Sequence, residues 1–412
     1  MKVAVFGPMP PERSGIADYS ALLLPALEAR CEIVTVRRGA KKAPRGSDLC
    51  VFHIGNNPDA HGWVVDALRR SPGLVVLHDF VLHHLVSGVT LGRGNGKAYL
   101  DALERDRGLP ARLLGHAVME KRIPPLWENR PEDFPLAGEV LDLATGLIVH
   151  SRHVHDRART AGFAGPIWII PHPAFPVPDL PAIEIAGEPL FAGFGNVNAS
   201  KRVPQLLAAF ARARPELPGG RLLLVGAVSP GFDLDRRLQR LGLDGSGLER
   251  EGYVEEDRLW QLMSAADVHV NLRSPTMGET SGTAIRALSL GKPLIVSDVG
   301  WFSELPDDVA LKVPVDDLEV ATLVAALELL GSRPDVRLAM GEAARELARR
   351  EHDVDLTADR YVAAFEQAVG GSAVSDAVLH DVSEAAAAVG IAPDSEEARA
   401  IAARLAEVDL GG

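Results

Sequence analysis

The 412-residue sequence has two cysteines, no block of basic residues and no long apolar run. Cys31 and Cys50 lie in apolar, strand-like runs without zinc-ligand spacing, which indicates small buried side chains in a reducing compartment. A formal net charge of −13 argues against a nucleic-acid partner, although the basic residues within 37–42 leave peripheral membrane binding open. No stretch approaches the ~18 apolar residues of a transmembrane helix. The first apolar run is too short for a signal peptide, so we expect a cytoplasmic protein.

The composition that is present, 47% hydrophobic and 24% charged residues, is typical of a globular protein. The chain is too long for one ordinary core, and its length favours two domains of roughly 170–190 residues. Apolar runs of strand length alternate with segments of helix length in both halves. This alternation predicts an α/β protein with two doubly wound parallel sheets.

The most informative stretch is 275–293, which reads PTMGETSGTAIRALSLGKP. A buried strand is expected just before it, and a helix over 283–290 is expected to end at Gly291. Free backbone N–H groups and the helix dipole make such a helix start an anion site. Glu279 would repel a bound phosphate, so we expect it to hold hydroxyl groups instead. An anion together with hydroxyls suggests a sugar phosphate or a nucleotide sugar.

A second helix start carries two cations in an unfavourable place. Lys201 and Arg202 open the helix that follows a predicted strand at 190–192. Cations at a helix N-terminus oppose the dipole and cost stability unless an anion lies nearby. We therefore assign both side chains to phosphate binding.

Polar residues also follow strands in the first half of the chain. Ser14 is a candidate N-cap for a helix over about 16–29, and Gly15 lies at its start. Residues 53–57 and the pair His78 and Asp79 come at two further strand ends, where ligands bind in parallel sheets. We favour a functional role for His78 and interpret the histidines at 83 and 84 as local structure.

Three segments are less regular. Residues 88–135 contain several glycines and prolines, and they fit either a lid or acceptor surface or a helical excursion packed on the domain. Residues 171–189 are rich in proline, which predicts a stiff connector between domains. After residue 371 we expect two short helices, starting near Ser375 and at 394–395, for packing or oligomer contact.

Six ordered segments together resemble the retaining nucleotide-sugar glycosyltransferases of the GT-B fold, the large group labelled glycosyl transferases group 1 or family four. These segments are FGPMPPERSGIADYS, VVLHDFVLHHL, IVHSRHV with IIPHP, FGNVNASKRV, EGYVEEDRLWQLMSAADVHV and GETSGTAIRALSLGKPLIVSDVGWFSELP. The resemblance covers about residues 1–370 and implies two Rossmann-like domains facing across a cleft. It implies an acceptor domain over 1–172, a linker over 173–189 and a nucleotide-sugar domain over 190–352. A helix over 353–371 would cross back to the first domain, and 372–412 would form a helical appendage.

The resemblance also implies roles for particular residues. The donor diphosphate would contact Gly15, Asn196, Lys201, Arg202, Ser281, Gly282 and Thr283. The donor sugar would contact His78, Asp79, Glu279 and Thr280, and the nucleoside would contact Tyr253, Val254 and Arg286. Lys201, Glu279 and His78 would be the residues of catalysis. Asn196 stands where the family usually has an arginine.

The GETSG turn departs from the family pattern of two glutamates separated by seven residues. Gly278 and Arg286 occupy those two positions, and Glu279 is one place later than the first. The turn resembles a subgroup variant, because the surrounding sequence is intact. Arg286 could point to the nucleotide or to solvent.

The implied reaction moves a hexose from a nucleoside diphosphate sugar to an acceptor hydroxyl, with retention of configuration, in cell-surface polysaccharide biosynthesis. Nothing in the predicted site resembles an Asp-x-Asp metal clamp, so we expect no cofactor and no obligatory metal. The partners would be a nucleotide sugar and a hydroxyl acceptor, with peripheral membrane association and a homo-oligomer left open. Two alternatives stay open: a GT-B-fold nucleotide-sugar epimerase and a catalytically silent sugar-nucleotide-binding protein.

Overall fold

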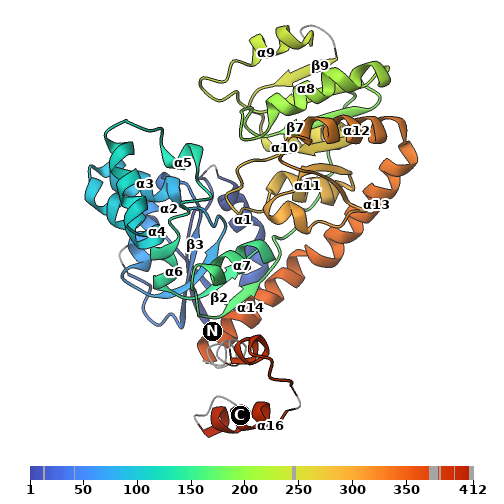
Figure 1. Cartoon of the computed structure of the whole chain (residues 1–412). Coiled ribbons are helices and arrows are strands. Elements are labelled where there is room, and N and C mark those ends of the chain that lie inside the picture. The colour runs from blue at the N-terminus through green and yellow to red at the C-terminus, as the bar shows by residue number, and fades with distance from the viewer. Residues whose placement is uncertain are drawn as a thin grey trace. The chain divides into compact units, whose positions relative to one another are not determined.

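The computed structural model describes residues 1–12, 14–40, 42–243, 247–370, 379, 382–393 and 395–407. The predicted helix starts at Ser375 and Asp394, and Lys41 of the basic segment, lie outside these residues. The chain divides into two compact units, Met1–Pro171 with Thr357–Gly412, and His172–Leu356 (Figure 1).

The first unit is built on a six-stranded parallel sheet of strand order β2-β1-β3-β4-β5-β6. Alternate residues of each strand enter opposite cores: Ala4 and Phe6 of β1 pack on one face, and Val3 and Val5 on the other. Because both faces are covered, the central strands are apolar at nearly every position. The strands are β1 (Lys2–Phe6), β2 (Glu32–Val36), β3 (Leu49–Ile54), β4 (Gly73–Leu77), β5 (Ala144–Val149) and β6 (Ile167–Ile169).

Helices cover both faces of this sheet. Ser14 caps the first of them, since its hydroxyl accepts the N–H of Ala17 at 3.1 Å, so the expected N-cap is confirmed. The helices along the chain are α1 (Gly15–Glu28), α2 (Pro58–Leu68), α3 (His83–Thr90), α4 (Gly96–Met119), α5 (Leu126–Asn129), α6 (Gly138–Leu143) and α7 (Arg152–Thr160), with a 3-10 turn at Leu91–Arg93.

The irregular segment 88–135 is a helical excursion with a small core of its own. Tyr99, Leu103 and Phe134 are buried there. Helix α4 bends at Gly108, whose φ of 73° and ψ of −173° are not helical. His83 is fully buried and contacts Phe134 O at 2.7 Å and Tyr99 Oη at 2.9 Å, in line with the structural interpretation of this residue.

The second unit has its own six-stranded parallel sheet, of order β12-β11-β10-β7-β8-β9. Its strands are β7 (Leu190–Phe194), β8 (Arg221–Val225), β9 (Leu248–Glu251), β10 (Val268–Asn271), β11 (Leu294–Ser297) and β12 (Ala310–Val313). Its helices are α8 (Val203–Ala213), α9 (Leu234–Leu241), α10 (Glu256–Ala265), α11 (Gly282–Leu290), α12 (Glu319–Ser332) and α13 (Pro334–Glu351), with 3-10 turns at Arg214–Glu216 and Gly300–Glu304. The proline-rich segment packs on this unit, through Phe175 and Ile183 among others.

Helix α14 (Val354–Gly370) returns to the first unit. Its Tyr361 and Phe365 are buried beside Tyr19 and Leu23 of α1 in one hydrophobic cluster. The hydroxyls of Tyr361 and Tyr19 lie 2.6 Å apart. Helix α16 (Glu396–Glu407) follows later in the chain. Two parallel sheets with surrounding helices confirm the predicted two-domain α/β fold class.

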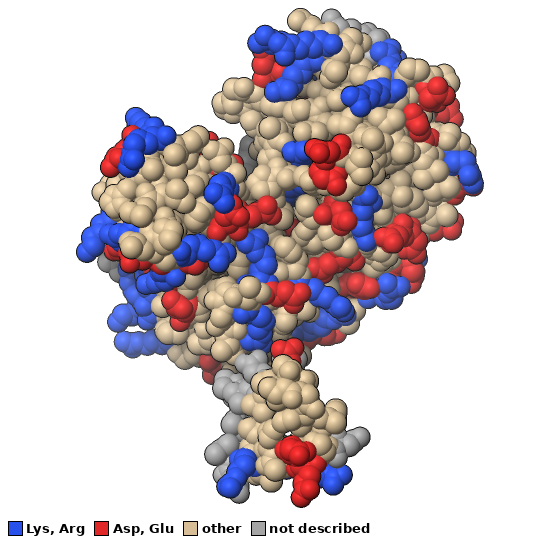
Figure 2. Space-filling model, in the orientation of Figure 1, with Lys and Arg blue, Asp and Glu red and all other residues tan. Residues whose placement is uncertain are grey.

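The exposure of the two cysteines differs from the expectation that both are buried. Cys31 and Cys50 are half-buried free thiols, not fully buried ones, and desolvation raises the pKa of each. On the face drawn in Figure 2, acidic and basic side chains are interspersed. Within the described part of the chain, no helix is long and apolar enough to cross a bilayer.

Candidate functional site

A ligand site in the second unit is expected where the strand order reverses. The chain moves outward from β7 through β8 to β9, then returns to place β10 on the other side of β7. Ligands of open α/β sheets bind beyond the carboxyl ends of the strands at such a point. A small cavity lies there, lined by residues of β7 and β10 and the segment after β7, including Gly195, Asn196, Lys201 and Asn271.

Lys201 lies beside this cavity with its ammonium in a desolvated place. Burial lowers its pKa well below the ordinary lysine value, and the positive charge of Arg273 lowers this pKa further. The ammonium forms no hydrogen bond or ion pair with any described residue. Its neighbour is the backbone of Gly195, which has a φ of 104°. An unpaired cation in such a place costs stability unless an anion binds to it.

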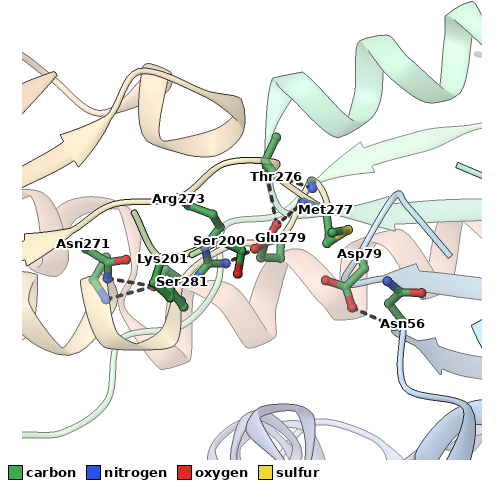
Figure 3. A network of polar contacts seen from close by, with 12 residues as sticks. Asn56, Asp79, Ser200, Lys201, Asn271, Arg273, Thr276, Met277, Glu279 and Ser281 are labelled. Carbon is green, nitrogen blue, oxygen red and sulfur yellow. Dashed lines mark hydrogen bonds and ion pairs between the residues drawn. The ribbon is translucent and has the colours of Figure 1, made fainter. Parts of the chain in front are cut away.

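Arg273 is a charged neighbour of Lys201 that the sequence analysis did not single out. It lies two residues after the end of β10, and its side chain is 12% exposed. Its guanidinium forms an ion pair with Glu279 (Figure 3). Its Cζ lies 5.7 Å from the ring centroid of Phe302. The signal that could have found it is an arginine placed just after a buried strand.

The carboxylate of Glu279 has protein partners for both oxygens. Oε1 accepts from Arg273, while Oε2 accepts the Thr276 hydroxyl at 3.1 Å and the Met277 N–H at 2.7 Å. These contacts hold the GETSG turn in shape. The expected sugar contact of Glu279 would therefore have to share a carboxylate that already organises the turn.

The start of α11 is arranged by its own hydroxyls. Ser281 is the N-cap and accepts the N–H of Ala284 at 3.4 Å. The Asn271 amide donates to Ser281 Oγ at 3.0 Å and to Thr283 Oγ1 at 2.8 Å. Thr280 differs from both, since its buried hydroxyl has no hydrogen-bond partner among the described residues. Gly282 begins the helix.

Arg202 has a partner that removes the original reason for assigning it to phosphate. Its guanidinium makes a two-pronged ion pair with Glu319, whose side chain is 3% exposed. The buried carboxylate of Glu319 thus supplies the negative charge that was expected from a bound phosphate. The structure gives Arg202 a role in tying α8 to α12.

Arg286 points neither to solvent nor outward from its helix. Its side chain is 7% exposed and donates to Glu256 at 2.9 Å. The guanidinium carbon lies 3.7 Å from the ring centroid of Phe175, and Trp260 also packs nearby. Arg286 therefore joins α11 to α10 and to the proline-rich segment, which corrects the solvent-facing alternative.

The remaining predicted residues of this unit lie at the surface. Asn196 is exposed directly after Gly195. Tyr253 is 66% exposed after β9, and Val254 packs partly against the core. The structure does not bring Tyr253 into the cluster around Lys201, so its nucleoside contact stays a prediction.

In the first unit, His78 is the middle of a row of three histidines from three neighbouring strand ends. Its Nε2 lies 3.0 Å from His53 Nδ1, and its Nδ1 lies 3.3 Å from His150 Nε2. His150 Nδ1 in turn lies 2.8 Å from the carbonyl of Ile170 and donates to it. Both ring nitrogens of His78 are therefore used within the unit. Desolvation lowers the pKa of His53 to about 3, so His53 is neutral at pH 7.

Asp79 and Gly15, the other two predicted residues of the first unit, differ in their exposure to solvent. The carboxylate of Asp79 accepts the backbone N–H of Asn56 at 2.7 Å, which ties the segments after β3 and β4 together. Gly15 begins α1, and a side chain placed on it would meet no atom within 4 Å. The helix start at Gly15 is thus accessible to a ligand.

The arrangement in the second unit has the chemistry to bind an anion. It combines a desolvated ammonium, a guanidinium, a helix start and a buried hydroxyl without a partner, all at the reversal point of the sheet. Among the described residues, no group of three His, Cys, Asp or Glu side chains could hold a metal ion.

Comparison with known proteins gives a family match within the second unit. Residues 188–332 match the family model described as Glycosyl transferases group 1. This segment contains the reversal point, Lys201, Arg273 and α11. A curated relative, D-inositol 3-phosphate glycosyltransferase of Segniliparus rotundus, is 28% identical over 199 residues, which are 46% of this chain. The chain spans 42% of the length of that relative.

Solved structures show the fold. Sucrose-phosphate synthase from Thermosynechococcus elongatus superposes with a TM-score of 0.62 at 19% identity, over 90% of this chain and 100% of its own. HepE from Anabaena, in complex with UDP and glucose, superposes with a TM-score of 0.55 at 16% identity, over 89% and 100%. The chain has the two-domain α/β fold of GT-B glycosyltransferases.

Proposed function

We propose that the protein is a retaining glycosyltransferase, which moves a hexose from a nucleoside diphosphate sugar to an acceptor hydroxyl. The observation that carries the proposal is the desolvated ammonium of Lys201 at the reversal point of the second sheet. A diphosphate supplies the negative charge that this cation lacks. The match to glycosyl transferases group 1 over the same segment, and a structural neighbour bound to UDP, support the choice of ligand.

In the proposed reaction, the bond from the sugar C1 to the diphosphate oxygen breaks, and a bond from C1 to the acceptor oxygen forms on the same face. The acceptor proton passes to the departing diphosphate, so no protein base or nucleophile is assigned. Charge develops on the leaving diphosphate, where Lys201 and the N–H groups at the start of α11 stabilise it as preorganised donors.

We further propose that these protein cations make a metal ion dispensable. Turnover is then expected to be unchanged by a chelator that removes divalent cations. A rate that collapses with EDTA and returns with Mg²⁺ would contradict this part of the proposal.

The first experiment is a thermal-shift screen with UDP, GDP, ADP and TDP and their sugars. A ligand that binds only the folded protein stabilises it by RT ln(1 + [L]/Kd), so the correct base gives the largest shift. Lys201→Ala is expected to abolish this shift and to reduce turnover by at least about 100-fold, as loss of a donor to a developing anion does. Unchanged turnover in Lys201→Ala would place the site elsewhere.

A second assay separates transfer from epimerisation and from silent binding. Transfer releases free nucleoside diphosphate only when an acceptor is added. Interconversion of nucleotide sugars without an acceptor would indicate an epimerase. Binding without turnover across an acceptor panel would indicate a silent binding protein.

A further inference from the structure

We propose that Arg273 is the second cation of the diphosphate site, and that Glu279 positions it for this role. The inference rests on the proposed function and adds a residue to it. Three groups of observations carry it: where the backbone places Arg273, what holds its side chain, and why the other candidate residues do not serve.

The backbone holds Arg273 next to the segment that carries Lys201. The N–H of Ser274 donates to the carbonyl of Ser200 at 2.9 Å, which joins the segments after β10 and β7. The N–H of Arg273 itself donates to Ser297 Oγ at 2.8 Å at the end of β11. Arg273 and Lys201 thus lie in the segments that follow two adjacent parallel strands, β10 and β7.

The side chain of Arg273 is held by a carboxylate that is itself fixed. Glu279 accepts from Thr276 and Met277 through Oε2, which leaves Oε1 for the guanidinium. A guanidinium presents its N–H donors in a planar fork that matches the geometry of a phosphate. A group fixed in this way binds phosphate with little loss of side-chain entropy.

The two cations also interact with each other. The charge of Arg273 contributes to lowering the pKa of Lys201, so the two groups are close enough to repel. Like charges held together in a desolvated place are stabilised by an anion that both contact. The ion pair of Arg273 with Glu279 offsets part of this repulsion.

The other candidates for the second cation have different surroundings. Asn196, at the position where the resemblance predicts an arginine, carries no charge. Arg202 forms a two-pronged ion pair with the buried Glu319. Arg286 pairs with Glu256 and stacks on Phe175. Arg273 is also paired with a carboxylate, but it is the arginine whose charge acts on Lys201.

The test measures binding with calorimetry, using inorganic pyrophosphate, the tightest of UDP, GDP, ADP and TDP, and the corresponding nucleoside. Arg273→Gln is expected to raise the Kd for pyrophosphate and for the nucleoside diphosphate by about 10- to 100-fold, which is the usual effect of losing a hydrogen bond to a charged group. The Kd for the nucleoside is expected to stay within about twofold, because it has no phosphate. Arg273→Lys is expected to fall between wild type and Arg273→Gln.

Controls separate a binding effect from misfolding. Arg273→Gln leaves Glu279 without its ion pair, so the double variant Arg273→Gln/Glu279→Gln removes both charges and is measured alongside. Arg221→Gln is the matched control, since Arg221 pairs with Glu249 at 2.7 Å between β8 and β9. It is expected to leave all three dissociation constants unchanged.

The outcomes are distinguishable. If wild type binds none of the nucleoside diphosphates, the proposed function fails, and this inference fails with it. If wild type binds one of them and folded Arg273→Gln binds it equally well, only the inference is overturned. It is also overturned if Arg202→Gln weakens pyrophosphate binding and Arg273→Gln does not.

Discussion

At the scale of single residues, we expect Lys201 to lower the stability of the ligand-free protein and to strengthen the binding of an anion. Lys201→Met keeps the apolar stem and removes the desolvated ammonium. We expect the ligand-free variant to be more stable than wild type by about 0.5–2 kcal/mol, the usual range when a strained functional group is replaced. Urea unfolding with and without pyrophosphate checks this, and with ligand the order of stability should reverse. Lys312→Met, at an ion pair with the exposed Asp307, is the control and should change little.

The same residue predicts a pH dependence. The pKa of Lys201 is lowered in the folded protein from an ordinary value of 10.5. Between the two pKa values the unfolded chain binds more protons than the folded one, so stability rises with pH in that window. The stability advantage of Lys201→Met should therefore shrink as the pH is raised toward 10.5. An advantage that stays constant over this range would contradict the assignment.

The ion pair of Arg202 with Glu319 predicts a large loss of stability. Arg202→Ala leaves a buried carboxylate without its partner and should cost about 3–5 kcal/mol. The double variant Arg202→Met/Glu319→Met should recover most of the loss, whereas Arg221→Ala at the more exposed pair with Glu249 should cost at most about 1 kcal/mol. Denaturant unfolding measures all three. If Arg202→Ala is as stable as wild type but does not bind pyrophosphate, the prediction is contradicted and Arg202 belongs to the diphosphate site.

The carboxylate partners of the candidate site's arginines could not be predicted from the sequence. The sequence showed a cation at position 202, where it opposes the helix dipole and lowers stability. It did not show the partner, because Glu319 lies 117 residues further along the chain. Arg286 pairs with Glu256, 30 residues away and on another helix. Only the packing of helices on the sheet brings such groups together. The positions of Lys201 just before α8 and of the start of α11 were predictable because they depend on local chain geometry.

At the scale of elements, the segment after β7 depends on a glycine in a neighbouring strand end. A side chain on Gly226, at a φ of 142°, would lie 2.1 Å from the carbonyl oxygen of Gly195. Gly226→Ala must displace the segment that leads to Lys201. We expect it to weaken pyrophosphate binding and to cost more stability than the roughly 1–3 kcal/mol of backbone strain alone.

Gly231 supplies the control for this prediction. Its φ of 80° carries a similar backbone cost, but a side chain there would meet no atom within 4 Å. Gly231→Ala should lose stability from strain alone and keep pyrophosphate affinity. Equal effects of the two variants on binding would show that the contact between Gly226 and Gly195 does not shape the site.

The histidine row at the ends of β3, β4 and β5 predicts sensitivity to acid. Burial lowers the pKa of His53 to about 3 and that of His61 to about 4. Below pH 6.5 the unfolded chain protonates first, so stability falls with pH until the folded pKa is reached. Between about pH 6 and 4, His53→Gln should reduce this slope by about 1.4 kcal/mol per pH unit. Urea unfolding at several pH values measures it, and identical slopes would contradict the prediction.

The elements themselves were largely predictable, and the exception has a physical cause. Strands buried on both faces read as continuous apolar runs, as β1 does over Lys2–Phe6. The helix predicted over 283–290 is α11, Gly282–Leu290. The segment 88–135 was predicted to be irregular from its glycines and prolines, and helix α4 within it bends at Gly108, close to Pro110. Tertiary packing of Tyr99 and Leu103 overrides these breakers.

At the scale of the whole molecule, the first unit depends on a helix from the far end of the chain. Tyr361→Phe removes the hydroxyl that contacts Tyr19 at 2.6 Å and should cost about 1–3 kcal/mol. Tyr361→Ala also opens a cavity and should cost about 3–5 kcal/mol. Hydrogen exchange in β1 and α1 measures the effect on this unit. Val369→Ala, at an exposed position of the same helix, is the control and should leave exchange unchanged.

The return of α14 has a consequence for how the protein is made. A ribosome finishes the sheet of the first unit early, but it then synthesises all of His172–Leu356 before it reaches Tyr361 and Phe365. During that time the apolar face of α1 around Tyr19 and Leu23 lacks its covering helix. A nascent chain stalled or cut short in this interval carries an unfinished first unit, so premature termination should yield polypeptides that chaperones and proteases recognise.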